Sequence, residues 1–142
     1  MDVDYLLRPG VPDDAAPLIS FWLEAAENDG RPIDHEADIE QLIERDPDAL
    51  LVADASGEIV GTLIVGWDGW RFHLYRLAVH PDWRGRGVAR AMVEEAERYC
   101  MRLGSHRVDA MVLEGNDLGT GFWQALGYTL QPDWRRWVRS LA

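Results

Sequence analysis

A segment rich in arginine and glycine, residues 77–89 (LAVHPDWRGRGVA), is suited to binding phosphate. Its apolar beginning predicts a strand, and its end leads into a predicted helix whose first amides and positive dipole end attract anions. Gly85 and Gly87 leave no Cβ in the way of a close ligand. Three arginines add positive charge around the same turn: Arg84, Arg86 and Arg90. These residue types in this order predict a phosphate site.

Other common sites are excluded by residue type or spacing. A dinucleotide fingerprint would need a third glycine where Arg90 stands, and neither a P-loop nor a G-x-S-x-G nucleophile elbow is present. All 14 basic residues are arginine, which excludes a lysine nucleophile and Schiff-base chemistry. The four histidines are scattered without the spacing of metal ligands, so no metal site is expected.

The composition predicts one globular domain, residues 1–142. Hydrophobic residues make up 47% and charged residues 27% of the chain, which argues against disorder. No apolar run approaches the roughly 20 residues that span a bilayer, and the first residues lack a signal-peptide pattern, so no membrane association is expected. The single cysteine, Cys100, excludes an internal disulfide, and we expect a cytoplasmic location.

Negative charge is concentrated in the first part of the chain. Residues 1–60 contain 16 acidic residues and three arginines, whereas residues 61–142 contain nine acidic residues and 11 arginines. An anionic ligand therefore finds its counter-charges in the later part, and the earlier part favours a cation. The alternative is that acidic helix faces only keep the protein dissolved. With a formal net charge of −11, nucleic acid is not an expected partner.

Hydrophobic spacing predicts seven strands and four helices around the phosphate segment. The expected strands are residues 5–8, 50–53, 59–67, 71–79, 108–113, 128–130 and 134–138. The expected helices begin at 13 or 14, cover about 36–45, run from about 89 to 103, and cover 117–126. The first helix ends near Ala26, before a polar turn at 28–32. We expect an α/β (α+β) fold with a mixed, mostly antiparallel sheet of six to seven strands and helices on both faces.

Two motifs resemble those of the GNAT superfamily of N-acetyltransferases. The pyrophosphate motif of that family is Gln/Arg-x-x-Gly-x-Gly/Ala, and residues 84–89 (RGRGVA) fit it between a strand and a helix. A second signature combines an asparagine, a small residue, a bulky aromatic pair and a Gly-aromatic pair. Its members here are Asn116, Gly119, Phe122, Trp123, Gly127 and Tyr128. The order and separation of the motifs are typical of the superfamily over nearly the whole chain, which implies a GNAT-like fold.

The resemblance implies that acetyl-CoA binds as co-substrate. It assigns the pyrophosphate to the turn and helix start: Arg84, Gly85, Arg86, Gly87, Val88, Ala89 and Arg90. It assigns the pantetheine arm to the backbone of Leu77, Ala78 and Val79, with an amide of Leu77 or Val79 polarising the thioester oxygen. Asn116 and Trp123 are expected to line the far side of the arm.

The implied reaction is direct transfer of the acetyl group to an amine. His73 stands where some members present a catalytic Glu or His, and Tyr75 lies on the same strand face, so the pair is our first candidate for a proton path. The alternative for His73 is a purely structural role. Glu114, at the end of the next predicted strand, is the second candidate base.

Trp123 departs from the family pattern. Many members carry tyrosine there as the acid for the leaving thiolate, whereas an indole N–H is no usable proton source. The acid is therefore absent, or it is Tyr128 or Tyr75. This departure keeps open a second class of function, a non-catalytic acyl-CoA sensor.

The acceptor pocket is expected between the first two helices and the turn before residue 71. Trp22, Trp67 and Trp70 fall there, beside Asp68, Glu24, Glu27 and the segment 31–36. Aromatic faces with carboxylates suit an organic cation, such as a small-molecule or peptide amine. For Trp22 the helical spacing leaves a core position as the alternative. Trp134 and Trp137 pack either the last strand or a second copy, so a monomer and a homodimer both remain open.

Overall fold

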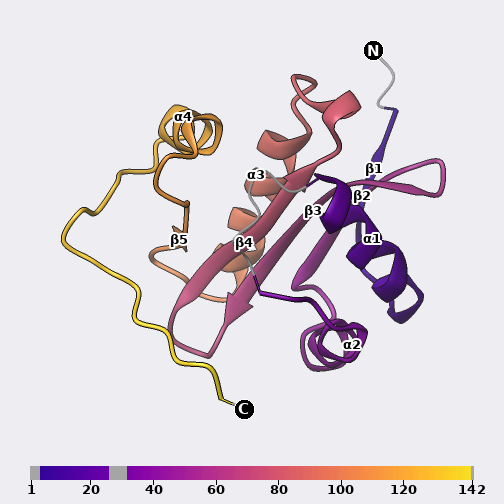
Figure 1. Ribbon diagram of the computed structural model, residues 1–142, viewed down its shortest axis with the longest axis horizontal. Helices are drawn as coiled ribbons and strands as arrows, with labels where there is room; N and C mark the ends of the chain where they lie inside the picture. Colours follow the sequence, from indigo (N-terminus) through magenta and orange to yellow (C-terminus); the bar gives the residue numbers. More distant parts are fainter. Residues whose placement is uncertain (1–3, 26–31, 142) are drawn as a thin grey trace. The chain divides into compact units, whose positions relative to one another are not determined.

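A five-stranded mixed sheet organises the first part of the computed structural model, which describes residues 4–25 and 32–141 (Figure 1). The chain forms two units, residues 1–111 and residues 112–142. The strands of the first unit are β1 (Leu6–Pro9), β2 (Leu50–Ala55), β3 (Glu58–Trp67), β4 (Phe72–Val79) and β5 (Asp109–Ala110). They lie in the order β1-β2-β3-β4-β5, and all neighbours are antiparallel except β4 and β5, which are parallel.

The predicted hairpin at 54–58 is confirmed as the β2–β3 connection. Ser56 and Gly57 both have positive φ angles, 53° and 93°, the conformation that lets a two-residue turn match the twist of the strands. The Asp54 side chain accepts a hydrogen bond of 2.7 Å from the Gly57 amide. The Ser-Gly pair therefore sets the register of β2 against β3.

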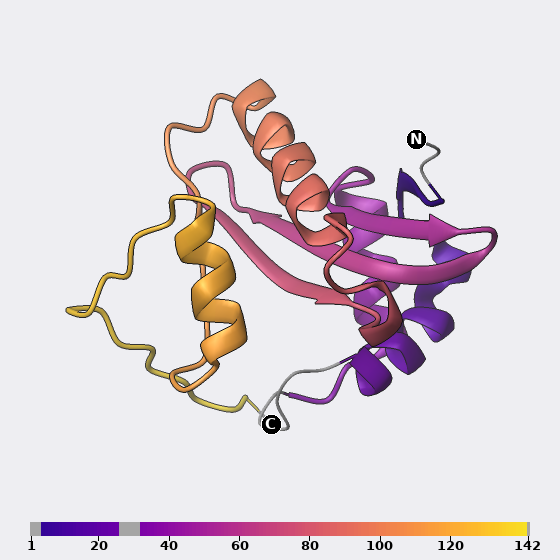
Figure 2. The same cartoon turned by 90° about the horizontal axis from the view of Figure 1, so that it is seen from above.

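Helices cover both faces of this sheet, as expected. The helices of the first unit are α1 (Ala15–Ala25), α2 (Glu36–Arg45) and α3 (Val88–Arg102), with short 3-10 turns η1 (Pro12–Asp14) and η2 (Pro81–Trp83) before α1 and α3. α1 and α2 pack on one face, where they share a core with β2 and β3, and α3 lies on the other face (Figure 2). The predicted helix 36–45 is confirmed residue for residue, because its apolar positions Ile39 and Ile43 are buried at helical spacing.

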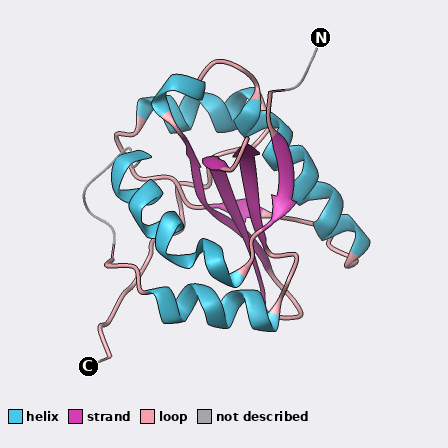
Figure 3. Cartoon of the chain, turned by 90° about the vertical axis from the view of Figure 1, so that its right-hand side faces the viewer, coloured by secondary structure: helices cyan, strands magenta, loops and turns pink. Residues whose placement is uncertain are grey.

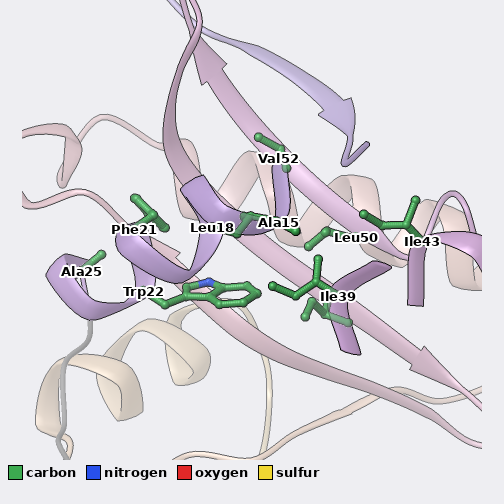
Figure 4. Close-up of a cluster of buried hydrophobic side chains, with 10 residues drawn as sticks. Ala15, Leu18, Phe21, Trp22, Ala25, Ile39, Ile43, Leu50 and Val52 are labelled. Carbon is green, nitrogen blue, oxygen red and sulfur yellow. The ribbon is translucent and has the colours of Figure 1, made fainter. Parts of the chain in front are cut away.

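The core on the α1–α2 face joins both helices to β2 and β3. Figure 4 shows Trp22, Leu18, Leu50 and Val52 among its ten buried side chains. On the other face, Gly61 of β3 lets α3 approach closely, because a Cβ at this position would lie 3.0 Å from Sδ of Met92. Close packing on both faces fixes β3 and β4 in the centre of the first unit.

The second unit contains one helix in its described residues, α4 (Asp117–Ala125). The predicted strands 128–130 and 134–138 are not confirmed, since residues 128–141 form turn and loop (Figure 3). The predicted strand 108–113 is shorter, with only Asp109 and Ala110 paired. Strand propensity alone does not hold a segment extended without a partner ladder, and Trp137 is 94% exposed. The described sheet therefore has five strands rather than six to seven.

In the described ranges, none of the helices is long and apolar enough to cross a bilayer.

Candidate functional site

A bulge interrupts β4 at Arg76 and Leu77. Tyr75 lies opposite Ile64 and Ala78 opposite Thr62, so two residues of β4 face the single residue Leu63 of β3. Arg76 has a φ of 56°, in the left-handed region that a non-glycine residue adopts only under strain. A bulge of this kind turns peptide groups out of the regular ladder.

Two buried side chains hold this bulge from the α1–α2 face. Trp22 Nε1 donates a hydrogen bond of 2.8 Å to Oγ1 of Thr62, and this hydroxyl donates one of 2.8 Å to the carbonyl oxygen of Arg76. The Arg76 guanidinium pairs with the Asp34 carboxylate and lies 5.2 Å from the centre of the Trp22 ring. The backbone and the side chain of Arg76 are therefore both fixed.

The outer edge of β4 is open beyond its first residues. β5 pairs only with His73 and Leu74, and within residues 4–25 and 32–141 no strand pairs with the same edge between Tyr75 and Val79. An unpaired strand edge presents backbone donors and acceptors to an extended ligand. This edge includes the predicted pantetheine positions Leu77, Ala78 and Val79.

The turn that follows β4 in the chain and leads into α3 has the geometry of an anion site. Gly85 and Gly87 have φ angles of 77° and 80°, and the space where each Cβ would stand is open. Gly87 is the N-cap of α3 and supplies no side-chain cap, and Ala91 donates the first amide hydrogen bond back to Gly87. The first helical amides, at Val88, Ala89 and Arg90, are therefore positioned to bind phosphate oxygens.

The three arginines of the turn have different surroundings. Arg84 donates a hydrogen bond of 3.4 Å to the carbonyl of Ala25, at the end of α1. Arg86 lies 4.6 Å from the centre of the Trp83 ring, and Arg90 is 3.9 Å from Glu94. Arg84 thus connects the turn to α1, whereas Arg86 and Arg90 are exposed at the surface, where their predicted role as phosphate partners stays a prediction.

His73 and Tyr75 are two residues apart on β4 and lie on the same face of the strand, as predicted. Nδ1 of His73 is 2.7 Å from Oδ1 of Asp109 on β5, and both side chains are about half exposed. The Tyr75 ring occupies the space above Gly66, where a Cβ would stand 2.8 Å from Cε1. Burial raises the pKa of the Tyr75 phenol above its usual range. The described face thus presents an imidazole oriented by a carboxylate, next to a protonated phenol.

The three tryptophans predicted for the acceptor pocket are not brought together. Trp22 is 2% exposed and belongs to the core, which was the alternative for this residue (Figure 4). Trp67 stacks on Phe72 with ring centres 5.6 Å apart, and Trp70 is 76% exposed beside Arg71. Of these three tryptophans, only Trp67 and Trp70, which flank one turn, are therefore accessible.

Asp68, in the same turn, is held as an anion. Its carboxylate accepts hydrogen bonds of 2.8 Å from the amides of Arg71 and Trp70, which lower its pKa. Glu27 and Arg31 of the predicted pocket lie outside the described residues, whereas Glu24 accepts a hydrogen bond of 3.0 Å from Nε2 of His80. Among the described residues, no group of three potential metal ligands is present.

The remaining predicted site residues belong to the second unit. Asn116 caps α4 by accepting a hydrogen bond of 3.0 Å from the Gly119 amide. Trp123 packs edge to face against Tyr128, with ring centres 4.7 Å apart, and Glu114 is exposed. The coenzyme and base roles assigned to Asn116, Trp123 and Glu114 stay predictions.

Sequence reasoning missed Thr62, Asp109 and Gly66. Each acts through a partner on a neighbouring strand or helix, and these pairs follow only from the strand register and the bulge. A pattern of alternating residues could have placed Gly66 opposite His73, but no signal in the sequence places a bulge at Arg76.

Comparison with known proteins decides the family. A model of the acetyltransferase (GNAT) family matches residues 16–128. The chain belongs to the acetyltransferase (GNAT) family. An acetyltransferase of Pectobacterium atrosepticum is 40% identical over 116 residues, which cover 82% of each chain.

Solved structures agree with this GNAT fold. PaiA N-acetyltransferase from Thermoplasma acidophilum, in complex with coenzyme A, superposes with a TM-score of 0.80 at 17% identity, covering 91% of this chain and 92% of that chain. Aminoglycoside N-acetyltransferase AAC(6')-Iy, in complex with CoA, gives a TM-score of 0.78 at 19% identity, covering 99% and 98%. The predicted superfamily is therefore confirmed, and this GNAT protein is an acetyltransferase by descent.

Proposed function

We propose that this acetyltransferase uses acetyl-CoA to acetylate a primary amine of a small molecule or peptide. One observation carries the proposal: the open, bulged edge of β4 leads through η2 into an α3 N-terminus without a side-chain cap. This continuous backbone offers an extended edge followed by an anion site, as a pantetheine arm with a pyrophosphate requires. The neighbours that contain coenzyme A support the same assignment.

The residues present fit acetyl-CoA. Amides from Gly85 to Arg90 would bind the pyrophosphate, and charge-assisted hydrogen bonds of this kind contribute about 1.5–3 kcal/mol each. The backbone of Leu77 to Val79 would pair with the pantetheine arm, and a β4 amide would polarise the thioester carbonyl. Acetyl-CoA supplies an activated acetyl group on a thiol that leaves readily.

His73 is the proposed general base. Asp109 accepts a hydrogen bond from the Nδ1–H of His73, which leaves the lone pair of Nε2 to take a proton from the attacking amine. The new N–C bond forms as the C–S bond breaks. A lysine-like amine with a pKa of about 10.4 requires roughly 4.6 kcal/mol for deprotonation at pH 7, and an α-amine near 8 requires about 1.4. The base therefore matters chiefly for amines of high pKa.

Tyr75 is the proposed proton donor for the departing thiolate. Its raised pKa keeps the phenol protonated at neutral pH, and the ring lies on the same face as His73. A thiol of pKa about 8.5 also leaves with little help, so the loss of the acid should cost less than the loss of the base. Trp123 would then pack near the arm without transferring a proton.

Direct transfer is favoured over transfer through a cysteine. Cys100 is the single cysteine, is 1% exposed on the buried side of α3, and burial raises its pKa to about 11. A buried thiol that stays protonated at neutral pH is no nucleophile.

An organic cation fits the surface beside the proposed base. The Asp68 carboxylate and the exposed Trp70 ring lie in the turn that leads into β4, close in the chain to His73.

The first and second units together form the single acetyltransferase domain in this proposal, which the family match across residues 16–128 supports. Both a monomer and a homodimer are compatible with it.

The proposed function is tested with His73→Ala and two acceptors. We expect the rate of thiol release to fall at least about tenfold with a lysine-like amine and much less with an α-amine, because only the first needs the base at pH 7. Thiol release from acetyl-CoA is followed over a panel of amines. Equal losses for both amines would remove His73 as base. Tight acetyl-CoA binding without thiol release for any amine would contradict the proposed enzyme and favour a non-catalytic acyl-CoA sensor.

A further inference from the structure

We propose that Thr62, oriented by Trp22, is a positioning residue that aims the Leu77 amide at the thioester carbonyl. The inference rests on the proposed acetyl-CoA site and goes beyond it by naming two side chains that do not touch the substrate. Thr62 is 0% exposed and Trp22 is 2% exposed, so both act from within the core. The hydrogen bond from the Thr62 hydroxyl connects them to the site at the carbonyl oxygen of Arg76.

The direction of the hydrogen bonds in this relay is fixed by residue type. The indole N–H of Trp22 can only donate, so the Thr62 oxygen is the acceptor in their 2.8 Å contact. A carbonyl oxygen can only accept, so the Thr62 hydroxyl hydrogen points at Arg76 in the second contact, also 2.8 Å. Trp22 therefore fixes the orientation of the Thr62 hydroxyl, and this hydroxyl fixes the orientation of the peptide group between Arg76 and Leu77.

The orientation of this peptide selects the donor. The N–H and C=O groups of a trans peptide point in opposite directions, and the described residues contain no cis peptide. Since the Arg76 carbonyl points toward the Thr62 hydroxyl, the Leu77 N–H points away from that hydroxyl. The sequence left Leu77 and Val79 as alternatives for the thioester, and the relay favours Leu77.

The bulge needs such a brace, because Arg76 is not a glycine. Its φ of 56° is unfavourable for a residue with a Cβ, and it persists only where the surroundings hold it. The Arg76 side chain is held by Asp34 from one side and by the face of the Trp22 ring, 5.2 Å away, from the other. The same indole thus supports the side chain through its face and the backbone through its N–H.

The test compares Thr62→Val, which keeps the shape but removes the hydroxyl, with Thr62→Ser, which keeps the hydroxyl. We expect Thr62→Val to lower kcat about 10- to 100-fold, as expected for a misdirected oxyanion donor, while KM for acetyl-CoA changes by less than about threefold. Thr62→Ser should restore kcat to within about threefold of the wild type. The matched control is Val52→Ala, because Val52 lies opposite Thr62 on β2, across β3 from β4, and its truncation loosens the same core. A kcat loss in Val52→Ala as large as in Thr62→Val would overturn the proposal.

A spectroscopic measurement separates this inference from the proposed function. Acetyl-CoA labelled with ¹³C at the acetyl carbonyl is bound without an acceptor, and its C=O stretch is recorded by difference infrared spectroscopy. A hydrogen bond from Leu77 should shift the stretch to lower frequency in the wild type and in Thr62→Ser, and less in Thr62→Val. If no amine is acetylated but this pattern holds, the proposed function fails and the positioning role stands.

Two results of the same measurement would contradict the positioning role of Thr62. An identical stretch in the wild type and Thr62→Val, or no shift in the wild type, would overturn the role of Thr62 even if the enzyme acetylates amines. If Thr62→Val does not fold, Trp22→Phe serves instead, because it frees the Thr62 hydroxyl to rotate and should give an intermediate shift.

Discussion

At the scale of single residues, the contact between His73 and Asp109 determines which ring nitrogen would accept a proton in the proposed reaction. A carboxylate only accepts hydrogen bonds, so the proton of the neutral imidazole is on Nδ1 and Nε2 is left as acceptor. The two residues pair through the short parallel contact of β4 with β5, which also pairs Leu74 with Ala110. The two-residue strand β5 thus serves to place one carboxylate.

We predict that Asp109→Ala lowers kcat/KM for a lysine-like amine by about tenfold or more, since the imidazole loses its fixed tautomer and orientation. Steady-state kinetics with saturating acetyl-CoA provides the measurement. Glu58→Gln is the control, because this exposed carboxylate lies at the start of β3, whereas His73 pairs with Gly66 near the end of that strand. If Asp109→Ala is as active as the control, Asp109 does not orient the base.

At the scale of elements, α3 carries glycines of the same conformation at its two ends. Gly87 precedes the helix with a φ of 80°, and Gly104 follows it with a φ of 89°; the space for a Cβ is open at both. A side chain at either position therefore meets the same backbone strain, roughly 1–3 kcal/mol. Only Gly87 adjoins the amides that would bind pyrophosphate.

We predict that Gly87→Val abolishes the thermal stabilisation by acetyl-CoA, whereas Gly104→Val lowers the melting temperature but keeps the stabilisation. The reason is that a β-branched residue at Gly87 both disfavours positive φ and fills the approach to the turn. Melting curves with and without acetyl-CoA measure the difference. Unchanged stabilisation of Gly87→Val would show that the turn is not the pyrophosphate site.

Elements with their own periodic pattern could be predicted from the sequence, and those that depend on partners could not. The spacing of Ile39 and Ile43 was enough for α2, and the Ser-Gly pair was enough for the β2–β3 turn. The tail after α4 has strand-like residues, but its extended form needs a paired edge that the pattern does not supply. The site divides in the same way: the turn at Gly85 and Gly87 follows from residue types, while the Thr62 relay depends on a bulge in the register.

At the scale of the whole molecule, a protein with a net charge of −11 uses one arginine to connect three elements of its first unit. Arg8 of β1 donates hydrogen bonds of 2.8 and 3.0 Å to Asp14 in η1 and one of 2.9 Å to Asp54 in β2. The hydrogen bond from Arg8, assisted by one from the Val11 amide, lowers the pKa of Asp14 despite its burial. The same guanidinium lowers the pKa of Asp54.

These lowered pKa values make the free energy of unfolding depend on pH in a defined direction. The pKa of an aspartate in the unfolded chain is about 3.9. The stabilisation from the contacts of Arg8 with Asp14 and Asp54 is therefore complete above that pH, and it is lost as the pH falls through the lower pKa values of the folded state. We predict that Arg8→Met lowers the free energy of unfolding by about 2 kcal/mol at pH 7 and by less at pH 3, where part of the wild-type contribution is already gone. Urea unfolding followed by circular dichroism at the two pH values measures both differences.

Arg98→Met is the control, because its partner Glu95 lies at 2.7 Å on the exposed surface of α3, where such pairs contribute about 0–1 kcal/mol. An equal loss for Arg8→Met at pH 7 and pH 3 would mean that Arg8 stabilises the fold by packing alone, not through its carboxylates.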